Sequence, residues 1–142
     1  MTEQMRDLGL LDRDECLRLL GSVAIGRIVF TARALPAVAP VNFAVVDGEI
    51  VLRTAPGSKL DAAVANSVVA FEADQFNLAR RGGWSVVVVG RAYVITEPER
   101  IALLDELDLQ CWLAGDRSNY VAVRPEMVSG RVLVPAELPA SA

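Results

Sequence analysis

The stretch AVAPVNFAVVDGEIVLRT, residues 37–54, decides the predicted fold. Two runs of mostly apolar residues flank Asp47 and Gly48, and Asp-Gly between such runs is a strong signal for a tight β-hairpin. We therefore predict antiparallel strands at residues 37–46 and 49–54. Pro40 cannot donate a hydrogen bond to a neighbouring strand, so the first strand should lie at a sheet edge or carry a bulge there.

The chain on either side of this hairpin adds short strands. Runs rich in β-branched residues predict five more, at residues 23–30, 67–74, 84–96, 120–124 and 129–134. The strand at 84–96 contains four consecutive valines, which indicates burial on both of its faces. Gly90 within it is expected to mark a bulge or a bend.

Three short helices are predicted from their capping residues. In each, a polar N-cap side chain is followed three residues later by an acidic residue: Asp12 and Glu15, Ser58 and Asp61, Thr96 and Glu99. The first helix should end at Gly21, the second should run through KLDAAVAN, and the third should reach about Leu109.

The order of these elements predicts a mainly β (α+β) domain. Strands that follow one another without crossover helices form antiparallel sheets, and here the sheet is expected to close as a small barrel with peripheral helices. With 142 residues, 53% of them hydrophobic, the chain suits one domain over residues 1–142. Its ordered core should span about residues 11–134, and residues 135–142 read as a tail.

Composition excludes several classes of function. The net charge of −4 and the lack of a basic run argue against nucleic-acid binding. The chain has no histidine, which excludes histidine-ligated metals and Ser-His or Cys-His catalytic pairs. Cys16 and Cys111 lack metal-like spacing and read as free thiols of a reducing compartment. Without a signal peptide or an apolar run of about 20 residues, the protein is expected to be cytoplasmic and away from membranes.

The segment RTAPGSK, residues 53–59, is the best candidate for chemistry. Lys59 is the one lysine among 14 basic residues, and it follows a Pro-Gly turn at the predicted start of a helix. A helix start with Ser58 and Lys59 suits a phosphate, to which Arg53 and Thr54 could add donors. An ordinary solvated lysine and a surface ion pair of Arg53 would give the same pattern, and the segment is too short to be a P-loop.

Several pieces in this order resemble the pyridoxamine 5′-phosphate oxidase-like family of FMN-binding split barrels. They are PVNFAVVDGEIVLRTAPGSKL, VVAFEAD, GWSVVVVGRAYVIT, the late Trp112 and YVAVRPEMVSGRVL. The resemblance spans about residues 11–134 and is closest to small bacterial members. It implies a homodimer with FMN at the interface and a small-molecule redox substrate.

The resemblance also implies site residues. Pro40, Val41, Asn42 and Phe43 would line the isoalloxazine through their backbone. Arg53 and Thr54 would lie beside the ribityl chain, and Ser58 and Lys59 would bind the phosphate. Ser85 falls where the oxidase has a glutamine at the ring, with Trp84 and Val86 on either side. Trp112 and Arg124 are weaker candidates for contributions from the second subunit.

Departures from the family pattern leave the reaction open. The oxidases hold their substrate with an Arg-x-His arrangement, and here the region reads Val123-Arg124-Pro125 without any histidine. We therefore expect a flavin-dependent oxidoreductase that does not oxidise pyridoxine phosphate, with Tyr120 and Ser85 as conceivable proton donors. Two alternatives stay open: a reductase that uses the deazaflavin F420, for which Arg80 and Arg81 could bind the acidic tail, or a flavin-binding module without turnover.

Overall fold

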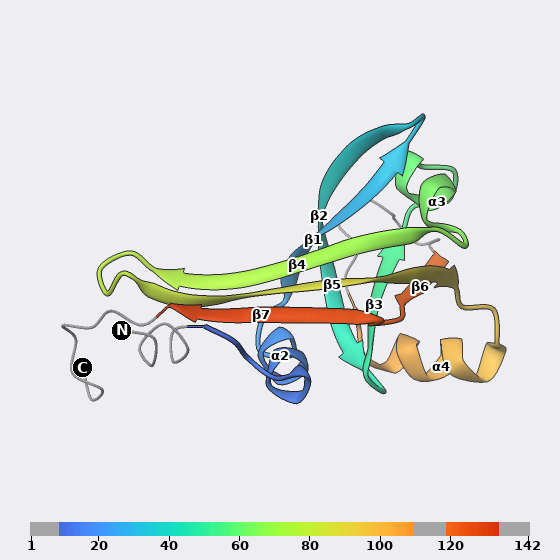
Figure 1. The fold of residues 1–142 in the computed structure, drawn as a ribbon. Coiled ribbons are helices and arrows are strands. Elements are labelled where there is room, and N and C mark those ends of the chain that lie inside the picture. The colour runs from blue at the N-terminus through green and yellow to red at the C-terminus, as the bar shows by residue number, and fades with distance from the viewer. Residues whose placement is uncertain (1–8, 110–118, 134–142) are drawn as a thin grey trace.

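The computed structural model describes residues 9–109 and 119–133. Seven strands and three helices lie in this part of the chain (Figure 1). The strands are β1 (Ile25–Ala32), β2 (Leu35–Val46), β3 (Glu49–Thr54), β4 (Val68–Asn77), β5 (Gly82–Val94), β6 (Asn119–Val123) and β7 (Met127–Leu133). The helices are α2 (Arg13–Leu20), α3 (Lys59–Val64) and α4 (Pro98–Glu106).

The sheet closes into an antiparallel barrel, as predicted. Six strands follow one another in the order β4-β1-β2-β3-β6-β5, and pairing between β4 and β5 closes the ring. β5 is long enough to pair with β6 near its end and with β7 along its first part. In Figure 1, β4, β5 and β7 extend together well beyond the barrel as a three-stranded arm.

Two apolar clusters stabilise this arrangement. The larger fills the barrel, where Phe43 and Phe71 meet edge to face at 4.6 Å between ring centroids, and α2 adds Cys16 and Leu20. The smaller lies where Leu104 of α4 packs with side chains of β3 and β6 that include Val51. Burial on both sides of β3 explains why its residues form a nearly continuous apolar run.

Hairpin turns connect the first three strands. Asp47 and Gly48 both have positive φ, at 51° and 77°, which confirms the predicted hairpin between β2 and β3. Between β1 and β2 the sequence predicted a loop that contains Arg33 and Pro36, but the structure has a tight turn, in which Arg33 and Ala34 also have positive φ, at 54° and 64°. Neither residue type favours that conformation, so the local sequence carries no turn signal there.

Other details of the strands differ from prediction. Val87 in the valine run is 37% exposed while Val86 and Val88 are fully buried, so β5 alternates and the prediction of two buried faces was wrong for this chain. Pairing of β4 with β5 continues through Gly90 without a bulge. A Cβ at Gly90 would lie 1.6 Å from the carbonyl oxygen of Arg124, so this glycine permits a close approach of two backbones.

The predicted helix caps are partly confirmed. The Asp12 and Ser58 side chains accept hydrogen bonds from the backbone N–H groups of Glu15 and Asp61. The capping box at Thr96 was wrong, because the N-cap is Glu97, which makes no side-chain capping bond and precedes Pro98. Pro40 pairs with Arg27 without a bulge, and no other described strand pairs with β2 before Phe43, so Pro40 lies on an edge as expected.

Candidate functional site

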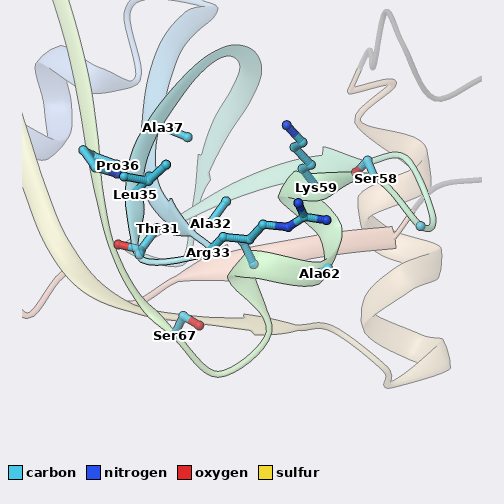
Figure 2. A pocket seen from close by; sticks show the side chains of 12 residues that line it. Thr31, Ala32, Arg33, Leu35, Pro36, Ala37, Ser58, Lys59, Ala62 and Ser67 are labelled. Atoms are coloured by element: carbon cyan, nitrogen blue, oxygen red, sulfur yellow. The ribbon is translucent and has the colours of Figure 1, made fainter.

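An open pocket of about 880 Å³ lies between the turn of the β1–β2 hairpin and the start of α3 (Figure 2). The hairpin wall consists of Thr31, Ala32, Arg33, Leu35, Pro36 and Ala37. The opposite wall consists of Gly57, Ser58, Lys59, Ala62, Ala63 and Ser67. The pocket therefore contains the Gly-Ser-Lys turn that the sequence had singled out.

The pocket is a local positive region on an acidic chain. Arg33 and Lys59 line it from opposite walls, and no carboxylate is among its lining residues. Figure 2 shows Arg33 extending from the hairpin turn toward α3, the helix whose first residue is Lys59. Since the chain as a whole carries a net charge of −4, this pairing of cations suits a small anion.

Asp61 holds the turn that presents Ser58 and Lys59. Its carboxylate accepts hydrogen bonds from the Thr54 hydroxyl at 2.8 Å, the Asn119 amide at 2.7 Å and the Gly57 N–H at 3.1 Å. The backbone N–H of Asp61 in turn donates to Ser58 Oγ at 3.0 Å, which leaves the serine proton available for a ligand. The Asn119 bond, with the other two, lowers the pKa of Asp61 despite partial burial, so this group stays ionised.

Arg53 and Thr54 lie at the end of β3, away from the lining of the pocket. Thr54 is 1% exposed, and its hydroxyl donates to Asp61. Arg53 Nη1 donates to the Leu109 carbonyl at 2.8 Å, and its guanidinium lies 5.3 Å from the centroid of the Tyr120 ring. Both residues thus have structural partners, and their predicted contact with a cofactor stays a prediction.

The residues predicted at the isoalloxazine fall on two sides of the barrel wall. Pro40 and Asn42 face outward, as does Ser85, since each alternates with inward-facing neighbours. The side chains of Phe43, Trp84 and Val86 belong to the buried core, and Val41 packs against it. Phe43, Trp84 and Val86 are buried and would therefore reach an external ligand mainly through their backbone. Of the residues predicted to bind the cofactor, the pocket beside α3 contains only Ser58 and Lys59.

The outward face also carries an acidic pair. Arg27 Nη1 lies 3.5 Å from Glu72 Oε1 and 3.6 Å from Asp74 Oδ2. Partial burial, together with the hydrogen bond and the charge of Asp74, raises the pKa of Glu72 to about 7, against the effect of Arg27. Asp74 pairs across the strands with Ser85. Glu72, two residues before Asp74 in β4, therefore lies near one of the residues predicted to contact the flavin ring.

We expect the stability of the protein to report this shift. A glutamate in the unfolded chain has a pKa of about 4.3. The folded state therefore binds the proton more tightly, and that contribution to stability is lost as pH rises from about 4.5 to about 7. Glu72→Gln keeps the neutral form, so its melting temperature relative to wild type should increase over this range.

Thermal melts at pH 5 and pH 8 would test this prediction. Glu97→Gln is the matched control, because Glu97 is exposed and makes no side-chain capping bond. Parallel pH profiles for Glu72→Gln and wild type would contradict the raised pKa.

The weaker candidates have partners in the structure. The Tyr120 hydroxyl donates to Asp105 at 2.7 Å, and burial, followed by that hydrogen bond, raises its pKa to about 12, which makes it a poor proton donor. The Arg124 guanidinium lies 4.8 Å from the ring centroid of Tyr93 and 3.8 Å from the Glu49 carboxylate. Trp112 and Cys111 lie outside the described residues.

No three His, Cys, Asp or Glu side chains within residues 9–109 and 119–133 are grouped so as to bind a metal ion. In the same part of the chain, no helix has the length and apolar character that a membrane crossing requires.

Sequence reasoning missed Arg33 and the full role of Asp61. Arg33 lies in a turn without a turn motif, and it lines the same pocket as Lys59 because α3 packs against β1. Asp61 was identified as a helix-capping residue, but its contact with Asn119 joins segments far apart in the chain. In the sequence, the only sign of this role was that an acidic residue, Asp61, follows Ser58 by three positions.

Comparison with known proteins identifies the family. The family model described as pyridoxamine 5′-phosphate oxidase matches residues 12–132. The uncharacterized protein Rv0080 of Mycobacterium tuberculosis is 44% identical over 143 residues, which cover 96% of this chain and 93% of that protein.

Solved structures share the fold. The FAD binding protein from Mycobacterium smegmatis has a TM-score of 0.79 at 36% identity, over 89% of this chain and 99% of that chain. A FAD-binding protein from Mesorhizobium loti has a TM-score of 0.70 over 87% and 96% of the two chains, and at 24% identity it shows the shared fold alone. Since the family model covers nearly the whole barrel, the chain belongs to the pyridoxamine 5′-phosphate oxidase family.

Proposed function

We propose that this chain is a flavin-binding oxidoreductase that holds the cofactor's phosphate at Ser58 and Lys59. The observation that carries the proposal is the pocket lined by two cations and no carboxylate, with the Ser58 proton free to donate. Charge-assisted hydrogen bonds from such groups are the usual way to bind a phosphate. The flavin binding of the M. smegmatis relative supports a flavin as the ligand.

The flavin would supply hydride or electron transfer, and the protein would bind and orient it. FMN is the form that the family resemblance implies, while the M. smegmatis relative binds FAD. Both forms carry a phosphate on the ribityl chain, so the same pocket residues serve either. The substrate is a small redox-active molecule, and the lack of histidine argues against pyridoxine phosphate.

A homodimer completes the proposal. Pro40, Asn42 and Ser85 face outward, so a single chain would cover only one side of a flavin ring bound there. The same outward face exposes Val87 and, at 64% exposure, Val38, which are apolar residues that a partner would cover. A second copy of the chain would then supply the other wall of the ring site.

F420 is a second candidate cofactor, favoured by Arg33. A basic residue beside the cleft suits the acidic tail of F420, and Arg33 lies there. Arg80 and Arg81, the residues considered from sequence, lie in the turn between β4 and β5, at the far end of these strands from α3 (Figure 1). Within one chain they are too far away to extend the pocket.

The purified protein tests the proposal directly. We expect a bound flavin that heat releases and mass spectrometry identifies, in a particle of twice the 15.3 kDa chain mass on gel filtration with light scattering. Adding that flavin to the apo protein at 100 times its dissociation constant should stabilise the fold by about 2.7 kcal/mol. A protein that takes up neither FMN, FAD nor F420 would contradict the proposal, and uptake of F420 alone would establish the second candidate.

A further inference from the structure

Arg33 is the second cation of the pocket, and it stands on the wall opposite Lys59. We propose that Arg33 binds a second anionic group that lies beyond the phosphate held by Lys59, so that the site selects an extended cofactor over FMN. The inference rests on the proposed function and names the cofactor class of the same site. The second anionic group is either the second phosphate of FAD or the carboxylates of the F420 tail.

The size of the pocket supports an extended ligand. Its volume of about 880 Å³ lies in the upper part of the range for sites that enclose whole small molecules. One phosphate fills a small part of such a space, and the Ser58 hydroxyl and the Lys59 ammonium can both donate to it from the α3 wall. Arg33 would then face unfilled volume, since it projects from the hairpin and not from the turn that carries Lys59 (Figure 2).

The hairpin wall beyond Arg33 is apolar. Leu35 is 67% exposed in this wall, and Pro36 and Ala37 continue it. An exposed leucine beside a cation suits a ligand that carries a flat apolar group after its charged group, because burying both surfaces is favourable. The adenosine of FAD is such a flat group and would pack on Leu35. The tail of F420 instead offers carboxylates, which would bind Arg33 but gain nothing from the apolar wall.

The competing arrangement is that both cations clamp one phosphate. A terminal phosphate carries a charge close to −2 at pH 7, which two cations would neutralise. In that case removing Arg33 would weaken FMN, whose phosphate is terminal, at least as much as FAD. The two arrangements therefore predict different responses to the same substitution.

The experiment measures dissociation constants of FMN, FAD and F420 for wild type and Arg33→Ala by fluorescence titration of the apo protein. Arg18→Ala is the matched control, because Arg18 is also an exposed arginine, lies in the last turn of α2, and is outside the pocket lining. We expect Arg33→Ala to weaken FAD or F420 about tenfold or more while FMN changes less than twofold. Arg18→Ala should change none of the three dissociation constants.

The pattern of losses identifies the second group. Selective loss of FAD assigns the second phosphate, and selective loss of F420 assigns the carboxylates. Equal weakening of FMN and the extended cofactors, or no weakening of any, would overturn the inference while leaving the proposed function intact.

A flavin-free probe separates the two proposals. Pyrophosphate should raise the melting temperature of wild type more than orthophosphate does, and Arg33→Ala should remove that difference. If none of the three cofactors binds, the proposed function fails, and this probe still reports whether Arg33 and Lys59 accept two linked anionic groups. Equal shifts by pyrophosphate and orthophosphate in wild type would count against the role of Arg33.

Discussion

Asp61→Ala is expected to destabilise the protein by about 2–4 kcal/mol, because one carboxylate satisfies three donors at the end of the barrel. Thr54 is 1% exposed, so its hydroxyl would lose its partner where water cannot replace it. The turn at Gly57 and the Asn119 amide would be released together. Urea denaturation of the apo protein measures this loss without any contribution from a ligand.

Two comparisons isolate the cause of that loss. Asp12→Ala removes an exposed N-cap carboxylate that accepts one hydrogen bond, from the N–H of Glu15, and should cost only about 1 kcal/mol. In the double variant with Thr54→Val the buried hydroxyl is gone, so the losses of the two single variants should not add. Additive losses would show that the contact between Asp61 and Thr54 contributes nothing.

The pH dependence of the same variant has a definite sign. Because the pKa of Asp61 is lowered in the folded protein, its contribution is complete above the ordinary value of about 3.9. It is lost as pH falls through the lower folded value. The difference in stability between wild type and Asp61→Ala should therefore narrow in acid, and a constant difference down to pH 2 would contradict the assignment.

The fold was predictable where local chemistry determines the backbone. Asp47-Gly48 has the composition that a tight hairpin turn prefers, and Ser58 has the side chain that a helix N-cap prefers. At Arg33 and Ala34 the sequence indicated a loop but not its tight-turn conformation, because the paired strands β1 and β2 impose positive φ on residues that do not favour it. Exposure of Val87 depends on what covers the outer face, which no property of β5 alone determines.

The candidate site, too, was predictable where its residues are neighbours in the sequence and not where tertiary packing brings them together. Ser58 and Lys59 are neighbours in the chain, so the sequence contained their pairing. Arg33 joins them only through the packing of α3 on β1, and Asn119 reaches Asp61 only because β6 pairs with β3. Such contacts come from tertiary structure. The sequence could therefore indicate an anion site at Ser58 and Lys59, but it could not show that Arg33 contributes a second cation.

Lys59→Ala should weaken flavin binding by about 1.5–3 kcal/mol, or roughly 10- to 150-fold, the range for hydrogen bonds that involve a charged group. Lys59 lines the pocket and is exposed, and it makes no hydrogen bond or ion pair with the other described residues. Its charge also stands at the start of a helix, where a cation is slightly unfavourable without an anion nearby. Removing it should consequently leave the stability of the apo protein unchanged.

This combination separates a ligand contact from a structural role. Titration of wild type, Lys59→Ala and Lys59→Arg with the same flavin should show a large loss for alanine and partial recovery for arginine, because arginine restores the charge with a different geometry. Thermal melts of the three apo proteins should coincide. Unchanged affinity of Lys59→Ala would mean that the lysine is only solvated, and the pocket would then lose the residue on which its assignment as a phosphate site mainly rests.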